Sequence, residues 1–243
     1  MAAAMAKTVV AFDLYGTLLS TESIAQQLGS HFGKDKAASI AAVWRKYQLE
    51  YTWRLNSMRR YEHFSEVTRK SLDHALGEHG VSLSDADADK LMDAYDSLST
   101  FPDVNPALRR LGEQSGITCV VFSNGTKTMV SNSVKRSSDL DSSVFKDIIT
   151  VDFVGAFKPA PEVYKYLAER VDKVGQERSM WLVSGNPFDV TGARAMGMQA
   201  AWVDRAGNGW QDRLGEAPTV VVKSLEEVAD AVEKYTSDSA TRG

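Results

Sequence analysis

An apolar run that ends in a single carboxylate is the feature of this sequence that most constrains its fold. Residues 9–12 (Val-Val-Ala-Phe) have the composition of a buried strand, and Asp13 follows directly, ahead of a turn at Gly16-Thr17. This pattern predicts a strand that delivers Asp13 to the C-terminal edge of a sheet, where open α/β sheets bind their ligands. These residues alone would also fit a polar strand end and a simple turn, so the interpretation depends on matching segments downstream.

Downstream of residue 101, short apolar runs alternate with stretches of helical periodicity. Strand-like composition occurs at 117–122, 148–151, 180–183, 199–203 and 220–222, and helical periodicity at 161–171, 191–196 and 224–235. Alternation of this kind is typical of βαβ units, in which helices connect parallel strands. We therefore expect an α/β fold with a parallel sheet.

A helical block separates the first expected strand from the others. Between residues 21 and 98 no strand-like run of β-branched residues occurs, whereas apolar residues recur at helical spacing. Helices are expected near 40–53, 61–79 and 85–98, with Ser84 as the N-cap of the last one.

The position of this block predicts its place in the fold. An insertion after the first strand would lie above the C-terminal edge of the sheet and cover Asp13 as a lid. We therefore expect a core domain of residues 1–20 and 102–243 and a helical cap domain of residues 21–101.

Composition narrows the classes of partner. A formal net charge of -4 argues against a nucleic-acid or anionic-membrane surface. No apolar run approaches membrane-spanning length, and residues 1–7 are too short and weakly apolar for a secretory signal. The single cysteine, Cys119, cannot form an internal disulfide. We therefore expect a cytoplasmic protein whose partners are small molecules.

Polar groups follow three more of the expected strands. Residues 123–125 (Ser-Asn-Gly), Lys158 and the segment 184–189 occupy these places. Taken singly, each has an ordinary explanation, namely a turn, a solvated surface charge, and a helix N-cap at Asp189. Together with Asp13 they form an ordered series of four, which is far more specific than any one member.

In this order, the four groups resemble the motifs of the haloacid dehalogenase superfamily. The matching residues are Asp13 as nucleophile, Ser123-Asn124, Lys158-Pro159 and the terminal acid Asp189. The resemblance covers nearly the whole chain, including the helical cap. It implies a Rossmann-like core in which Asp13 attacks the substrate.

Two positions separate carbon–halogen cleavage from phosphate-ester cleavage. Most members of the superfamily are magnesium-dependent phosphatases with a second aspartate two residues after the nucleophile, where this chain has Tyr15. A basic alkoxide benefits from a proton donor at that position, whereas a halide leaves as a stable anion. The fourth motif offers a single carboxylate, Asp189, which weakens a magnesium site. We therefore expect no metal and no other cofactor.

The cap segment points to the same chemistry. Residues 44–45 (Trp-Arg) and 48–53 (Gln-Leu-Glu-Tyr-Thr-Trp) are similar to the cap of the L-2-haloacid dehalogenases. In that family an arginine at the position of Arg45 binds the departing halide, and Phe188 matches an aromatic position beside it. Without the other motifs, Arg45 would also fit a surface helix, solvated or paired with Glu50, and Phe188 a core position.

The resemblance implies a double displacement on short L-2-haloalkanoic acids. Asp13 attacks the α-carbon and forms an ester, the halide ion leaves, and water hydrolyses the ester to give a D-2-hydroxyacid with one inversion. The residues implied in catalysis are Asp13, Thr17, Arg45, Ser123, Asn124, Lys158, Tyr164, Ser184, Asn186 and Asp189. Those implied in substrate binding are Leu14 and Tyr15, through their backbone amides, with Arg45, Ser123, Asn124 and Phe188.

Within this set, the resemblance implies particular roles around the nucleophile. Thr17 orients Asp13, and Lys158 offsets the charge of two nearby carboxylates. Tyr164 supports Lys158.

The remaining members serve the substrate, the halide and the water. Ser123 and the backbone amides hold the substrate carboxylate, while Arg45 and Asn124 stabilise the halide. Asp189 activates water with help from Ser184 and Asn186.

Some points stay open at this level. Gly185 replaces a small polar residue and Lys46-Tyr47 replaces a Gln-Lys pair, which bears on substrate size and turnover more than on reaction type. A magnesium-dependent phosphatase of small phosphorylated metabolites and a non-catalytic member that binds small acids are the alternative functions. The resemblance also implies a homodimer formed through the cap.

Overall fold

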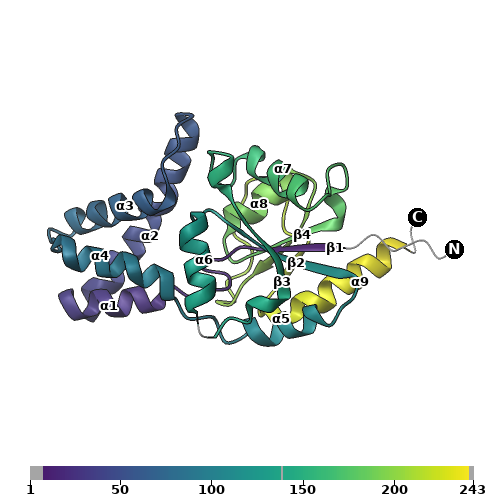
Figure 1. Ribbon diagram of the computed structural model, residues 1–243, viewed down its shortest axis with the longest axis horizontal. Coiled ribbons are helices and arrows are strands. Elements are labelled where there is room, and N and C mark those ends of the chain that lie inside the picture. The colour runs from purple at the N-terminus through teal and green to yellow at the C-terminus, as the bar shows by residue number, and fades with distance from the viewer. Residues whose placement is uncertain (1–7, 138, 241–243) are drawn as a thin grey trace.

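The computed structural model describes residues 8–137 and 139–240, within which six strands form one parallel sheet (Figure 1). The strands are β1 Thr8–Phe12, β2 Ile117–Ser123, β3 Phe145–Thr150, β4 Met180–Ser184, β5 Gln199–Val203 and β6 Val220–Val222. Their order is β3-β2-β1-β4-β5-β6, and every neighbouring pair is parallel. The predicted α/β fold is confirmed, although β3 begins three residues before the expected 148–151.

β1 lies at the centre of the sheet, between β2 and β4. All residues of β1, β4 and β5 are buried, as expected for strands covered on both faces. The register pairs Phe12 with Val121 on one side and with Val183 on the other. The residues that follow these strands, including Asp13, therefore emerge together at the C-terminal edge.

Helices cover both faces of the sheet. Figure 1 shows α5 (Val104–Gly112) and α9 (Val228–Ala240) together on one side, with α7 (Pro161–Arg170) and α8 (Pro187–Ala195) on the other. The sequence pattern did not predict α5. It predicted α8 only from residue 191, whereas the helix begins at Pro187, a residue that suits the first helical turn because its missing N–H is not needed there.

Short 3₁₀ helices connect several of these elements. They are η1 Tyr95–Ser97, η2 Ser142–Val144, η3 Val151–Phe153, η4 Glu177–Ser179 and η5 Leu225–Glu227. The last of these and α9 replace the single helix predicted over 224–235.

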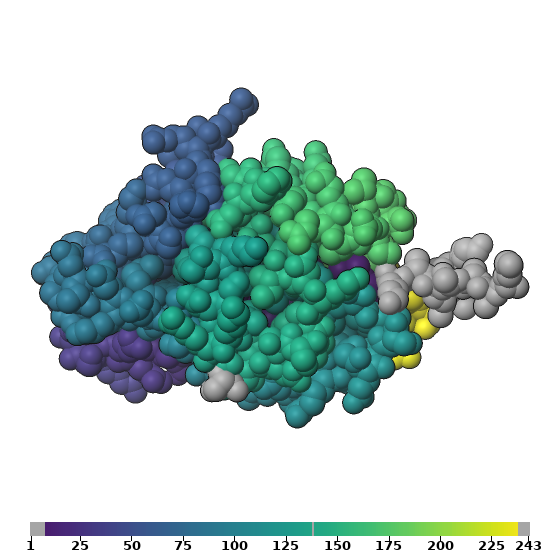
Figure 2. Space-filling model, viewed as in Figure 1, coloured from purple at the N-terminus to yellow at the C-terminus, as the bar shows by residue number. Residues whose placement is uncertain are grey.

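Between β1 and α5 the chain is helical, as predicted. The helices are α1 Glu22–Phe32, α2 Lys34–Ser57, α3 Phe64–Glu78 and α4 Asp85–Ala94. Figures 1 and 2 show them gathered at one end of the molecule, beside α6 (Lys127–Arg136). Ser84 caps α4 as predicted, and its hydroxyl oxygen accepts a hydrogen bond from the Asp87 amide at 3.1 Å. The division into core and cap domains at residues 21 and 101 stays a prediction.

The chain enters and leaves this helical segment along two adjacent paths. The Ser20 amide donates to the Ser99 carbonyl at 2.9 Å, and the Phe101 amide donates to the Leu18 carbonyl at 3.2 Å. These contacts tie the segment to the loop that follows β1.

Arg205, in the loop after β5, binds residues at the place where the chain enters and leaves the helical segment. Its Nε and Nη2 donate to the Asp103 carboxylate at 3.1 and 2.9 Å, and its guanidinium lies 3.9 Å from the centre of the Phe101 ring. Nη2 also donates to the Thr17 carbonyl at 2.9 Å. One side chain thus joins the nucleophile loop to the base of the helical segment.

Across residues 8–137 and 139–240, no helix is both long and apolar enough to cross a membrane. Residues 1–7, which were judged too short for a secretory signal, lie outside the described residues. The expected cytoplasmic location stays a prediction. Cys119 is buried in β2.

Arg205→Ala is expected to lower the free energy of unfolding by about 2–4 kcal/mol, because it leaves the largely buried Asp103 carboxylate without its cation. Urea unfolding followed by circular dichroism measures this loss. Arg110→Ala is the control, since its pair with Asp230 is exposed and should contribute less than about 1 kcal/mol. Equal losses in the two variants would contradict the role given to Arg205.

Candidate active site

Asp13 lies one residue beyond β1 and is 7% exposed. Its Oδ2 atom accepts hydrogen bonds from the Thr17 hydroxyl at 2.8 Å and Asn186 Nδ2 at 2.7 Å, and the Ser184 hydroxyl donates to it at 3.4 Å. Among the described residues, Oδ1 accepts only from Lys158 Nζ, at 3.2 Å. The carboxylate is therefore fixed through Oδ2, while Oδ1 keeps a lone pair available.

Lys158 is 1% exposed, although it carries a charge. Its ammonium group donates to Asp13 at 3.2 Å, to Asp189 Oδ2 at 2.7 Å and to the Phe122 carbonyl at 2.7 Å, and it lies 4.2 Å from the centre of the Phe122 ring. Three acceptors thus match the three donors of an ammonium group. As the sequence predicted, Lys158 faces two carboxylates.

Asp189 is fully buried in the first turn of α8. Its Oδ1 accepts a hydrogen bond from the Tyr164 hydroxyl at 2.7 Å and its Oδ2 accepts from Lys158. Burial raises the pKa of Asp189 to about 6, and the Lys158 charge limits the rise. A carboxyl group with this pKa can exchange a proton near neutral pH. Tyr164, predicted to support Lys158, donates to Asp189 instead.

The structure also differs from the contacts predicted for Ser184 and Asn186. Both were expected to help Asp189 activate water, which stays a prediction, and in the structure both donate to Asp13. The cause is the pairing of β4 with β1, which brings the end of β4 alongside Asp13. The alternative role of Asp189 as an N-cap is wrong as well, because Asn186 occupies that position.

Arg45 reaches the core from α2. Its Nη2 donates to Asn186 Oδ1 at 3.1 Å and its Nη1 donates to Gln48 Oε1 at 2.6 Å. The alternative pairing with Glu50 does not occur, because Glu50 binds Arg54 on the outer side of the helix. Arg45 is half-buried and faces the same amide that holds Asp13.

A small cavity of about 10 Å³ lies between α2 and the edge of the sheet, with room for about one water molecule. The helical segment and the sheet-containing part of the chain both contribute residues to its lining. These residues are Asp13, Tyr15, Arg45, Leu49, Phe64, Ser123, Asn124, Asn186 and Phe188. Lys158 and Asp189 do not line it. Lys158 is linked to the cavity through Asp13, because its ammonium group donates a hydrogen bond to that carboxylate.

Aromatic rings close two sides of this cavity. The Phe188 ring meets the edge of the Trp53 ring at 5.5 Å, and the Tyr15 ring stacks on Phe64 at 6.2 Å. The Tyr15 hydroxyl lies 3.3 Å from Ser133 Oγ, and burial raises the pKa of Tyr15. Tyr15 therefore contributes an apolar ring where a phosphatase has an acid.

Several donors near Asp13 remain available. Ser123 Oγ accepts a hydrogen bond from the Gly125 amide at 3.1 Å, so its own proton can be donated elsewhere. No described residue accepts a hydrogen bond from the Leu14 or Tyr15 amide. Asn124 uses its side-chain oxygen to accept from the Lys158 amide at 2.9 Å. These are the residues predicted to bind substrate.

Sequence reasoning did not assign Gln48 and Leu49. They lie three and four residues after Arg45, so the helical period could have placed them on the same face. The Gly185 departure also has a structural cause, because a Cβ atom there would lie 2.7 Å from the Gly16 carbonyl oxygen.

Within the part of the chain that the structure describes, no group of three or more His, Cys, Asp or Glu side chains is arranged to hold a metal ion. The two site carboxylates, Asp13 and Asp189, share the ammonium group of Lys158. Activity without a metal or other cofactor stays a prediction.

Three features of this site are typical of a known class of hydrolase. They are an aspartate at the edge of a parallel sheet, a buried lysine beside it, and an arginine supplied by an inserted helical segment. The chain belongs to the haloacid dehalogenase-like hydrolases, whose family model matches residues 7–197. The membership predicted from the four motifs is thus confirmed.

Particular enzymes of this family are similar to the chain over most of its length. The (S)-2-haloacid dehalogenase H-109 of Pseudomonas putida is 36% identical over 91% of this chain and 96% of its own length. The structure of L-2-haloacid dehalogenase from Xanthobacter autotrophicus has a TM-score of 0.84 and 28% identity, covering 93% of this chain and 98% of that one. A structure of the same enzyme with chloropropionic acid covalently bound has a TM-score of 0.82 at the same identity and coverage.

Tyr164→Phe is expected to raise the pKa of Asp189 above about 6, because the lost hydrogen bond stabilises the ionised carboxylate. Carbon-13 NMR of the Asp189 carboxyl carbon during a pH titration measures the change. Since this pKa is higher in the folded than in the unfolded protein, stability falls as pH rises through it, and that fall should shift to higher pH. Tyr166→Phe, two residues further along α7, is the control. An unchanged or lower Asp189 pKa in Tyr164→Phe would refute the assignment.

Proposed function

We propose that this protein is a hydrolytic dehalogenase that converts short L-2-haloalkanoic acids into D-2-hydroxyacids, with inversion and without a metal. One observation carries the proposal: a single cavity is lined by a carboxylate with an available lone pair, Asp13, and by a guanidinium group, Arg45. The relatives named (S)-2-haloacid dehalogenases and the Xanthobacter structure with chloropropionic acid covalently bound support it.

Substrate binding uses the donors next to Asp13. The Ser123 hydroxyl and the amides of Leu14 and Tyr15 receive the substrate carboxylate, since their protons are not donated to other described residues. An anion held there by charge-assisted hydrogen bonds places the α-carbon beside Asp13.

Asp13 Oδ1 is the attacking atom. Its lone pair forms the bond to the α-carbon, while the carbon–halogen bond breaks and its electron pair leaves with the halide. Oδ2 cannot serve as readily, because three side chains donate to it. The product of this step is an ester between Oδ1 and the substrate.

The halide leaves toward Arg45. A guanidinium group has five N–H donors, and the hydrogen bonds to Asn186 and Gln48 use two of them, so others can face an anion. Asn124 adds its side-chain Nδ2 donors, and the Phe188 ring can direct its positive edge toward the halide.

Hydrolysis of the ester uses the groups around Oδ2, which is now the carbonyl oxygen. A water molecule gives a proton to Asp189 and attacks the Asp13 carboxyl carbon, so negative charge develops on Oδ2. The donors on Oδ2 from Thr17, Asn186 and Ser184 stabilise that charge. Collapse breaks the bond between the carboxyl carbon and Oδ1, and the leaving alkoxide takes the proton of the hydroxyl group just added to Asp13, which gives the hydroxyacid and the Asp13 carboxylate. Asp189 then returns its proton to solvent.

A homodimer formed through the helices of the cap segment and a cytoplasmic location belong to this proposal. Both rest on the resemblance to the family. Sedimentation of the purified protein at several concentrations tests the dimer.

Chloride release from 2-chloropropionate tests the activity. With EDTA present, we expect release from the L enantiomer and none from the D enantiomer, together with formation of D-lactate. Hydrolysis of p-nitrophenyl phosphate only with magnesium would instead support the phosphatase alternative. Binding of small acids without either reaction would support the non-catalytic alternative.

Asp13→Asn is expected to reduce halide release by at least about 1,000-fold, because the amide lacks the nucleophilic carboxylate. Halide release is measured on protein whose intact mass excludes deamidation back to aspartate. Asp141→Asn, at an exposed carboxylate, is the control and should match the wild type. Undiminished activity in Asp13→Asn would reject the nucleophile.

A further inference from the structure

α2 contacts the core at a second point, far along the helix from Arg45. Nδ2 of Asn56 donates to the Phe157 carbonyl at 2.7 Å, and the Phe157 amide donates to Asn56 Oδ1 at 2.9 Å. One side-chain amide therefore pairs with both main-chain groups of a residue 101 positions away. An asparagine can do this because it carries both an acceptor and a donor.

Phe157 directly precedes Lys158, in a segment outside any helix or strand. The next amide, that of Lys158, donates to the Asn124 side chain at 2.9 Å. The backbone that carries Lys158 is thus held by two asparagine side chains. Asn124 comes from the core, and Asn56 comes from the helix that also carries Arg45.

α2 is one continuous helix, so its two contacts with the core are linked. Arg45 and Asn56 are eleven residues apart, or about 16 Å along the axis. Arg45 donates to Asn186, which holds Asp13 Oδ2, while Asn56 holds the residue before Lys158, which donates to Asp13 Oδ1. Both oxygens of Asp13 are therefore connected to the same helix, Oδ2 through Asn186 and Oδ1 through Lys158 and the preceding residue, Phe157.

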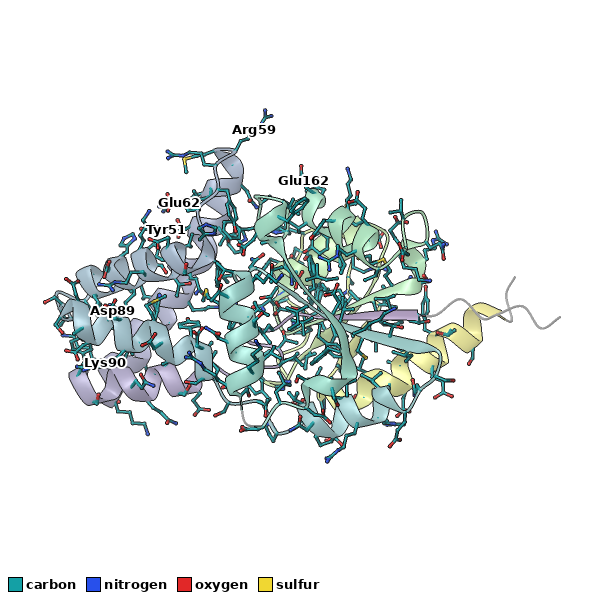
Figure 3. All side chains as sticks on the ribbon, in the orientation of Figure 1. Tyr51, Arg59, Glu62, Asp89, Lys90 and Glu162 are labelled. Atoms are coloured by element: carbon teal, nitrogen blue, oxygen red, sulfur yellow. The ribbon has the colours of Figure 1, made fainter. Side chains whose placement is uncertain are left out.

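The cavity next to Asp13 is small and lies between α2 and the core, so a movement of α2 away from the core would open it to a haloacid. Asn56 lies where α2 meets the core. There it lines an open groove of about 740 Å³ together with Trp53, Pro159 and Phe188. Figure 3 shows Arg59 just beyond the projecting end of α2 and Glu162 at the start of α7. The groove is bordered by α2, α7 and α8.

We propose that Asn56 is a positioning residue, whose paired hydrogen bonds with Phe157 set the Lys158 segment in place when α2 closes over the substrate. The inference rests on the proposed dehalogenase function. Neutral hydrogen bonds suit this purpose, because they are directional but weak enough to break and re-form in each turnover. Closure then aligns Arg45 and Lys158 with Asp13 in one movement.

Two substitutions at Asn56 and one neighbouring control test this proposal. Asn56→Leu removes both hydrogen bonds and keeps a side chain that branches at the same atom, and Asn56→Ala removes them without any steric conflict. Ser57→Ala is the control, because Ser57 is exposed on the same turn and lines the same groove. We expect kcat for L-2-chloropropionate to fall at least about tenfold in both Asn56 variants, and KM to change little.

Two further measurements separate positioning from a purely structural role. Hydrogen exchange of the Phe157 amide should become faster in both Asn56 variants and stay unchanged in Ser57→Ala. The acidic limb of the kcat profile should move above its wild-type pH, because a displaced Lys158 no longer lowers the pKa of Asp189.

The outcomes are distinguishable from those for the function itself. Absence of chloride release by the wild-type protein would reject the dehalogenase proposal and, with it, this inference. If the wild type is active, normal kcat and pH profiles in both Asn56 variants would overturn the inference alone. It would also be overturned if the loss disappeared after correction for the folded fraction measured by circular dichroism.

Discussion

The arrangement of the site depends on one buried ammonium group. An isolated charge in the position of Lys158 would be strongly unfavourable, and it is accommodated because two carboxylates and a carbonyl oxygen accept its three N–H groups. A single cation cannot fully neutralise two carboxylates. Burial raises the pKa of Asp189, the more deeply buried of the two, and the charge of Asp13 raises it further, while Asp13 faces the cavity. Burial thus places two chemically identical groups in different surroundings, as the proposed roles of nucleophile and base require.

The parallel sheet makes this cluster possible, and α2 completes it. The C-terminal ends of β1, β2 and β4 lie next to one another at one edge of the sheet. Residues far apart in sequence therefore surround Asp13. α2 then brings the Arg45 guanidinium to the opposite side of the cavity. The two cations therefore have different surroundings. Lys158 donates to both carboxylates, whereas Arg45 lines the cavity, where the proposed reaction forms a new anion.

Much of this could be predicted from the sequence, because the predictive signals were local. The apolar run before Asp13 and the polar groups after later strands identified the sheet edge, and the resemblance of the cap segment to a known family identified Arg45. The partner of each polar group was less predictable. Whether Ser184 reaches Asp13 depends on the register of β4 against β1, because a one-residue shift would turn its side chain to the other face of the sheet. Asn56 has no sequence signal, because its partner is a backbone group that any residue could supply.

In the proposed reaction, Tyr15 favours a leaving group that is a stable anion. Its ring packs so closely that a Cβ atom at Gly125 would lie 2.9 Å from it, and its hydroxyl is directed to Ser133 rather than to Asp13. Burial also raises the pKa of that hydroxyl. A phosphate ester at Asp13 would therefore lose an alkoxide beside an aromatic ring that offers it no proton, whereas a halide needs none. The proposed choice of reaction thus depends on the absence of a proton donor at Tyr15 as much as on the nucleophilic carboxylate of Asp13.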